Sequence, residues 1–169
     1  ISGGAGNDLI YGNQGADTIS SAAGTDTIFG GQDNDSIIGD SDAQLVYGNL
    51  GVDVLSGAAG NDTLYGGQGN DNLSGGTNAD RLYGNAGDDN VTGGGGADIL
   101  NGGVGNDTII FAGDGADTVY GGDGADSIDG GDSNTGSNNT GTNVIYGGAG
   151  NDEVTFRGDV SGFVIYGDD

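Results

Sequence analysis

The sequence contains no cysteine, histidine, methionine, tryptophan or proline, and its only basic residues are Arg81 and Arg157. Without cysteine the chain has neither a disulfide scaffold nor a thiol nucleophile. Without histidine it has no catalytic triad and no imidazole ligand for zinc, copper or iron. Its 26 acidic residues give a formal charge of −24. Because nucleic-acid binding needs a basic surface, we expect no nucleic-acid partner.

Several motifs of enzymes and membrane proteins are also missing. No apolar run approaches membrane-spanning length, so we expect no membrane insertion. There is no HExxH or GxSxG motif, and the glycine pairs lack the lysine of a phosphate-binding loop. Stacked carboxylates can serve glycoside chemistry, but carboxylates that are saturated by a metal are poor acids. We therefore expect no catalytic residue in this segment and do not interpret it as an enzyme.

What the sequence has in abundance is glycine, 42 of 169 residues, arranged in a nine-residue repeat. Two clear copies lie in tandem at Gly57–Ser74, GAAGNDTLY followed by GGQGNDNLS. Six glycine-rich residues with an acidic end turn readily, and the last three alternate as in a short strand. Two copies therefore close one circuit. The predicted fold is all-β: a right-handed parallel β-roll or β-helix solenoid with two short strands per eighteen-residue coil.

The repeat can be followed through seventeen copies from Gly3 to Tyr166, with one extra residue at Phe111. An insertion begins at Gly130, and we expect an inserted loop at about residues 130–142. A solenoid has no separate domains, so we expect residues 1–169 to form a single repeat domain of about eight coils. The chain starts in mid-pattern, and we expect it to be a fragment of a larger protein.

Two positions of the repeat carry the fold prediction. The fourth is glycine in thirteen copies, and the exceptions are Asp33, Asp42, Asn78 and Ser161. Three of these four tolerate a left-handed backbone, which indicates that the position needs a positive φ. The eighth position is aliphatic in every copy and forms the predicted core: Ile10, Ile19, Ile28, Ile37, Val46, Leu55, Leu64, Leu73, Leu82, Val91, Leu100, Ile109, Val119, Ile128, Ile145, Val154 and Ile165.

The composition by itself favours disorder, because glycine is costly to order and the acidic charge repels itself. Bound cations would neutralise the acidic charge and so favour an ordered chain. Aspartates eighteen residues apart stack in one column beside turn carbonyls, and such an all-oxygen shell suits Ca²⁺ better than the strictly octahedral Mg²⁺. Twelve divalent ions would cancel the charge of −24, so we expect calcium ions on the order of a dozen.

The copies GGAGNDLIY at Gly3–Tyr11, GGQGNDNLS at Gly66–Ser74 and GGVGNDTII at Gly102–Ile110 resemble the calcium-binding nonapeptide of the RTX (repeats-in-toxin) proteins of the haemolysin type. The resemblance covers nearly the whole chain. It implies a β-roll with calcium between successive turns on both sides. It also implies a bacterial exoprotein that is exported unfolded by type I secretion and folds in the calcium outside the cell. The secretion signal of such proteins is not visible in this sequence.

The family's metal ligand falls on the sixth position of each copy and gives two columns of aspartates. The first column is Asp17, Asp35, Asp53, Asp71, Asp89, Asp107, Asp126 and Asp152. The second column is Asp8, Asp26, Asp62, Asp80, Asp98 and Asp117, interrupted by Gln44 and ended by Asn143 and Phe163. We expect full calcium occupancy along the first column, except beside the insertion after Asp129. In the second column we expect a weak or empty site around Gln44.

The ninth position distinguishes the two faces of the predicted roll. Even copies end mostly in small or polar residues, whereas odd copies form an aromatic ladder broken by Asn101: Tyr11, Phe29, Tyr47, Tyr65, Tyr83, Tyr120, Tyr146 and Tyr166. Stacked rings can simply stiffen a parallel sheet. Alternatively, this face makes a lateral contact with another protein domain, another copy or a polysaccharide.

Two functions remain open on the sequence alone. We favour a calcium-binding structural domain of a bacterial secreted or cell-surface protein, of the S-layer or adhesin type, that folds and stiffens on binding Ca²⁺. The alternative is the C-terminal calcium-dependent folding and secretion module of a type I-secreted enzyme or toxin, such as a protease, lipase, epimerase or haemolysin. A catalytic domain preceding Ile1 would favour the alternative.

Overall fold

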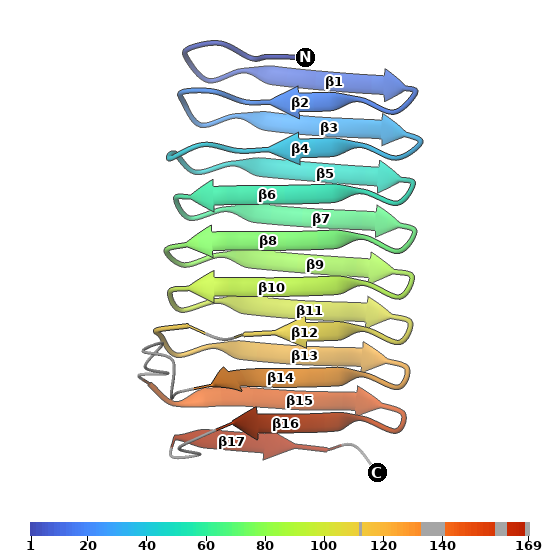
Figure 1. The fold of residues 1–169 in the computed structure, drawn as a ribbon, viewed down its shortest axis with the longest axis vertical. Helices are drawn as coiled ribbons and strands as arrows, with labels where there is room; N and C mark the ends of the chain where they lie inside the picture. The colour runs from blue at the N-terminus through green and yellow to red at the C-terminus, as the bar shows by residue number, and fades with distance from the viewer. Residues whose placement is uncertain (112, 133–140, 158–161, 168–169) are drawn as a thin grey trace.

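The computed structural model describes residues 1–111, 113–132, 141–157 and 162–167, which form a stack of coils with two strands in each (Figure 1). One strand of every coil belongs to a nine-stranded parallel sheet: β1 (Leu9–Gln14), β3 (Thr27–Gln32), β5 (Leu45–Leu50), β7 (Thr63–Gln68), β9 (Arg81–Ala86), β11 (Ile99–Val104), β13 (Thr118–Asp123), β15 (Asn143–Ala149) and β17 (Phe163–Tyr166). The other belongs to an eight-stranded parallel sheet: β2 (Thr18–Ser20), β4 (Ser36–Ile38), β6 (Val54–Ala59), β8 (Asn72–Thr77), β10 (Asn90–Gly95), β12 (Thr108–Ile110), β14 (Ser127–Asp132) and β16 (Glu153–Arg157).

The register between neighbouring coils is the eighteen-residue period of the sequence. Leu64 in β7 pairs with Val46 in β5 on one side and with Leu82 in β9 on the other. Each strand pairs with the strand two elements away in the chain, so every coil stacks directly on the one before it (Figure 1). The predicted all-β parallel solenoid is confirmed. No helix long and apolar enough to cross a membrane occurs in the part of the chain that the structure describes.

The core is the predicted column of eighth-position side chains, pressed between the two sheets. Residues from Ile10 to Ile145 in this column are buried, and Val154 is partly buried. The prediction is wrong for Ile165, which is 50% exposed. Ile165 lies in β17, the last strand of its sheet, so it packs against β15 on one side only.

The irregular residues of the repeat meet in a second apolar group, the phenylalanine cluster of Phe111, Phe156 and Phe163. The extra residue Phe111 is fully buried, and its ring lies edge-on to those of Phe156 and Phe163, with centroids 6.5 and 6.3 Å away. The rings of Phe156 and Phe163 also pack together, with centroids 4.3 Å apart. Phe163 occupies a sixth position, so at this point of the second column a ring replaces the carboxylate.

The predicted left-handed turns are largely present. All thirteen fourth-position glycines have a positive φ, and so do Asp33 and Asn78. Asp42 contradicts the prediction, because its φ is not positive. Its backbone N–H instead donates to Asp40 Oδ1 at 2.9 Å, which folds this turn differently. Ser161 lies outside the described residues.

Beside the insertion, β13 and β15 stay in register, whereas the pairing of β14 with β16 shifts between Asp129 and Asp132. β13 pairs with β15 through Val119 and Ile145, and these two residues are 26 positions apart instead of eighteen. The predicted loop at 130–142 lies mostly outside the described residues, since 133–140 are not among them. The chain on both sides of it continues the two sheets.

The outer face of the nine-stranded sheet carries the predicted aromatic ladder. Ring centroids are separated by 4.8–5.1 Å along the five residues from Tyr11 to Tyr83, with interplanar angles of at most 10°. Tyr120, Tyr146 and Tyr166 form a second stack with spacings of 4.9 Å. Asn101 in β11 pairs with Tyr83 and Tyr120 and separates the two stacks.

Candidate metal centres along the two edges

The sixth-position aspartates lie in two columns, one along each edge of the roll where the chain turns into a strand. Aspartates of the first column precede strands of the eight-stranded sheet, and those of the second precede strands of the nine-stranded sheet. In both columns the backbone N–H of one aspartate donates to Oδ1 of the aspartate one coil further on. The distance is 2.7 Å from Asp71 N to Asp89 Oδ1 and 2.8 Å from Asp62 N to Asp80 Oδ1.

These hydrogen bonds hold one oxygen of each carboxylate and leave the other free. Within the described residues, Oδ2 is buried and has no hydrogen-bond partner in twelve of the fourteen predicted ligands: Asp8, Asp17, Asp26, Asp35, Asp53, Asp62, Asp71, Asp80, Asp89, Asp98, Asp107 and Asp126. The other two, Asp117 and Asp152, accept the same Oδ1 hydrogen bonds from Asp98 and Asp126. A buried charged oxygen without a partner is costly, so the columns fit a bound cation.

The free oxygens face backbone carbonyls across a small space at the first position of each repeat. A Cβ built on Gly66 would lie 2.5 Å from Asp71 Oδ2 and 2.8 Å from the carbonyl oxygen of Gly84, one coil further on. A glycine therefore keeps this space open. No three carboxylates converge on one point among the described residues, so a cation held here would take many of its ligands from backbone carbonyls. Oxygen ligands of this kind suit Ca²⁺.

Burial makes the charged form of these carboxylates unfavourable. It raises the pKa of Asp62, Asp71 and Asp107 to about 6, against an ordinary value of 3.8. The pKa values of Asp80, Asp89 and Asp117 rise further, to about 7, also mainly through burial. The backbone hydrogen bond to each carboxylate works in the opposite direction, and repulsion from neighbouring aspartates adds to the rise. A site that resists negative charge in this way favours a bound positive ion.

The second column contains two amides at ligand positions. Gln44 and Asn143 are buried. Their side-chain oxygens continue the ladder of hydrogen bonds between successive sixth positions, accepting from Asp26 N at 3.1 Å and from Asp117 N at 2.6 Å. The predicted interruption at Gln44 is thus an interruption of charge and not of the hydrogen-bond ladder. Phe163, the other predicted departure, belongs to the phenylalanine cluster.

Two kinds of residue near the columns were missed from the sequence. Ser21 takes the place of a first-position glycine, and its hydroxyl is buried without a hydrogen-bond partner among the described residues. Fifth-position asparagines such as Asn61 and Asn70 bind the next coil along the chain, accepting from Ala79 N and Asp88 N at 3.2 and 3.1 Å. The asparagine that often precedes the sixth-position aspartate is the sequence signal for these contacts.

We expect Gly66→Ala to weaken calcium binding and stability together. Gly66 has an ordinary φ, so the added methyl group causes no backbone strain but enters the space between Asp71 Oδ2 and the Gly84 carbonyl. Overpacking alone costs about 1–3 kcal/mol, and the calcium-free Asp71 carboxylate adds to this. Calorimetric calcium titration and urea unfolding of the variant measure both effects.

Gly95→Ala is the matched control, since its Cβ would meet nothing within 4 Å and its φ is also ordinary. We expect this variant to keep the calcium affinity and stability of the original chain. Equal losses in Gly66→Ala and Gly95→Ala would contradict the placement of the cation beside Gly66.

Comparison with known proteins agrees with this geometry. The family model of the RTX calcium-binding nonapeptide repeat matches residues 1–28, 20–55, 47–80, 74–109, 109–135 and 138–159. No curated protein matches the chain. The family match spans most of the sequence and includes both aspartate columns. The chain therefore belongs to the family of RTX calcium-binding nonapeptide-repeat proteins.

Proposed function

We propose that this chain is a structural domain that binds calcium ions along both edges and folds and stiffens as it does so. The ligands are the fourteen sixth-position aspartates of the two columns, with ions on the order of a dozen. The observation that carries the proposal is the free, buried Oδ2 atom that recurs in both columns. Chance burial of single aspartates would not repeat at every coil of a parallel stack.

The chain's own residues make this binding cooperative. Most aspartates of the columns donate their backbone N–H to Oδ1 of the aspartate one coil further on, so the position of a carboxylate depends on the coil before it. A coil that is ordered at one site thereby presents ordered ligands for the next. Bound calcium supplies the positive charge that offsets repulsion among the stacked carboxylates. Because the coils are joined by nearest-neighbour contacts, folding should spread along the stack.

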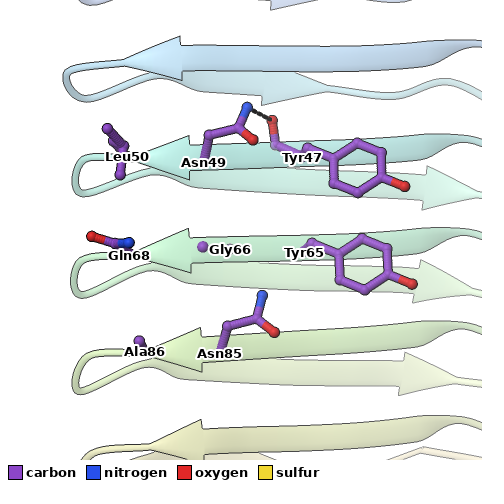
Figure 2. Close-up of a pocket in the computed structure, with 9 residues that line it drawn as sticks. Tyr47, Asn49, Leu50, Tyr65, Gly66, Gln68, Asn85 and Ala86 are labelled. Atoms are coloured by element: carbon purple, nitrogen blue, oxygen red, sulfur yellow. Dashed lines mark hydrogen bonds between the residues drawn. The ribbon is translucent and has the colours of Figure 1, made fainter.

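We also propose a structural role at the bacterial surface, as an S-layer or adhesin element outside the cell. The aromatic ladder supports this, because it gives one face of the roll two columns of stacked rings, of five and three residues. Beside it lies an open groove of about 580 Å³, lined by Tyr47, Tyr65, Asn49 and Asn85 (Figure 2). Gly67 pairs with both asparagines and leaves the floor of the groove without a side chain. A face with rings and amides suits lateral contact with a protein or a polysaccharide. The alternative remains the folding module of a secreted enzyme or toxin.

Counting bound ions tests the calcium proposal. Equilibrium dialysis against Ca²⁺ should give on the order of a dozen ions per chain, and an excess of Mg²⁺ should not displace them. A count of two or fewer would contradict the assignment of both columns as binding sites.

Sedimentation tests the proposed lateral contact. In calcium the original chain should self-associate through the aromatic face, and Tyr47→Ser combined with Tyr65→Ser should shift it to the monomer while the calcium count stays the same. If the original chain is monomeric at every concentration, contact between copies through this face is wrong and the enzyme or toxin module becomes the better proposal.

A further inference from the structure

The side chain of Gln44 is one methylene longer than that of the aspartates in its column. Its amide has one oxygen, which can accept a hydrogen bond as aspartate Oδ1 does, and an NH₂ group in place of the second carboxylate oxygen. Its Oε1 accepts from Asp26 N at 3.1 Å, as an aspartate Oδ1 would, and its own N–H donates to Asp62 Oδ1 at 2.7 Å. The hydrogen-bond ladder therefore runs through Gln44 without a gap. Gln44 is only 3% exposed, so its other amide atom contacts protein atoms of the turn and not solvent.

That other atom, Nε2, lies among three oxygens. Its two N–H groups are shared among Asp40 Oδ1 at 2.7 Å, the carbonyl oxygen of Gly24 at 3.0 Å and the carbonyl oxygen of Asp42 at 3.1 Å. The carbonyls come from fourth positions of two successive coils, and the carboxylate comes from the same turn as Gln44. At the aspartate positions a free, buried carboxylate oxygen stands where Gln44 has this donor. An NH₂ group among oxygens supplies positive charge density where its neighbours need a cation.

The turn around Gln44 is rebuilt to form this arrangement. Its second and fourth residues, Asp40 and Asp42, are not among the positive-φ residues of the described chain, unlike most second and fourth residues elsewhere. Asp42 N donates to Asp40 Oδ1, and Asp42 Oδ2 accepts from Gly24 N at 3.0 Å. The preceding strand β4 ends early, at Ile38. Two acidic side chains are thus used inside a hydrogen-bonded network instead of facing an ion.

We propose that the Gln44 amide occupies the place of a calcium ion, so that at this one position of the second column successive coils are held together without metal. The inference rests on the proposed function, that the aspartate columns bind calcium. It has two consequences. The second column is divided into two ion-binding segments, one on each side of Gln44. The coils joined by Gln44, residues 24–62, order at lower calcium concentration than coils joined only by aspartates.

Gln44→Glu tests this inference directly, because it keeps the size and Oε1 of the side chain and replaces the NH₂ donor with an anionic oxygen. That oxygen would face Asp40 Oδ1 and two carbonyls and would need a cation. We expect the variant to bind one more calcium ion per chain than the original in equilibrium dialysis. Gln32→Glu, the same change at an exposed position of β3, is the matched control and should leave the count unchanged.

Hydrogen exchange followed during calcium titration gives a second readout that does not depend on the variant's folding. In the original chain, amides of residues 24–62 should become protected at a several-fold lower calcium concentration than those of residues 71–107, and Gln44→Glu should abolish this order. An unchanged ion count in a folded Gln44→Glu, or simultaneous protection of both segments in the original chain, overturns the inference. An original chain that binds no calcium would instead refute the proposed function itself.

Discussion

Replacing Asp89 with alanine should produce one of the largest losses of stability available from a single residue of the roll. Asp89 Oδ1 accepts from Asp71 N at 2.7 Å, and a buried N–H left without an acceptor costs about 1–3 kcal/mol. The change also removes a proposed calcium ligand. Loss of an ion present at 100 times its Kd removes about 2.7 kcal/mol of stabilisation. Urea unfolding in saturating calcium measures the sum.

Two further variants separate these contributions. Asp89→Asn keeps an oxygen for Asp71 N and removes the charge, so it should show mainly the loss that is due to the ion. Asp88→Asn makes the same change of charge at the exposed neighbour, whose Oδ1 accepts from Asn106 N at 2.8 Å. We expect Asp88→Asn to leave calcium binding nearly intact. An Asp89→Ala variant no less stable than Asp88→Asn would contradict the role of the first column.

Acid should partly replace calcium. The pKa values of Asp80, Asp89 and Asp117 are raised by burial to about 7 in the folded chain, whereas the ordinary value is 3.8. Between these values the folded chain binds protons that the unfolded chain does not, so its stability increases as the pH falls and is lost as the pH rises through about 7. In a chelator, far-UV circular dichroism should show little β-structure at pH 8 and substantially more at pH 5.

The same protonation should oppose calcium, because protons and Ca²⁺ compete for the carboxylates. The calcium concentration at half-saturation should therefore increase as the pH is lowered. High concentrations of NaCl at pH 8 are the control, since salt screens repulsion between exposed charges but does not neutralise buried carboxylates. A calcium-free chain with more β-structure at pH 8 than at pH 5 would contradict the burial of these aspartates.

The regular part of this fold could be predicted from the sequence because each residue's environment repeats. A glycine-rich turn followed by an aliphatic triplet specifies the strands, and the eighteen-residue period fixes which side chains stack. Leu64 is buried and Asp71 lies on an edge for the same reason as their equivalents one coil away. The positions of the aspartate columns, the core and the aromatic ladder all follow from this period.

The departures from the repeat could not be placed in the same way. Phe111, Phe156 and Phe163 are separated in sequence, and a pattern that assigns each position separately does not show that three irregular residues share one cluster. At Gln44 the sequence indicated a missing charge. It did not indicate that the amide donates to Asp40, because that contact depends on a turn whose backbone differs from the others.

The central claim, that calcium folds this roll, is tested most directly by far-UV circular dichroism at pH 8 as calcium is added to the chelated chain. A steep transition from coil to β-structure at roughly 0.1–1 mM calcium, the range of extracellular modules, is the result we predict. The same titration with magnesium should leave the coil spectrum unchanged. A full β spectrum in the presence of chelator would contradict the claim, because the coils would then be stable through their hydrogen bonds and packing alone.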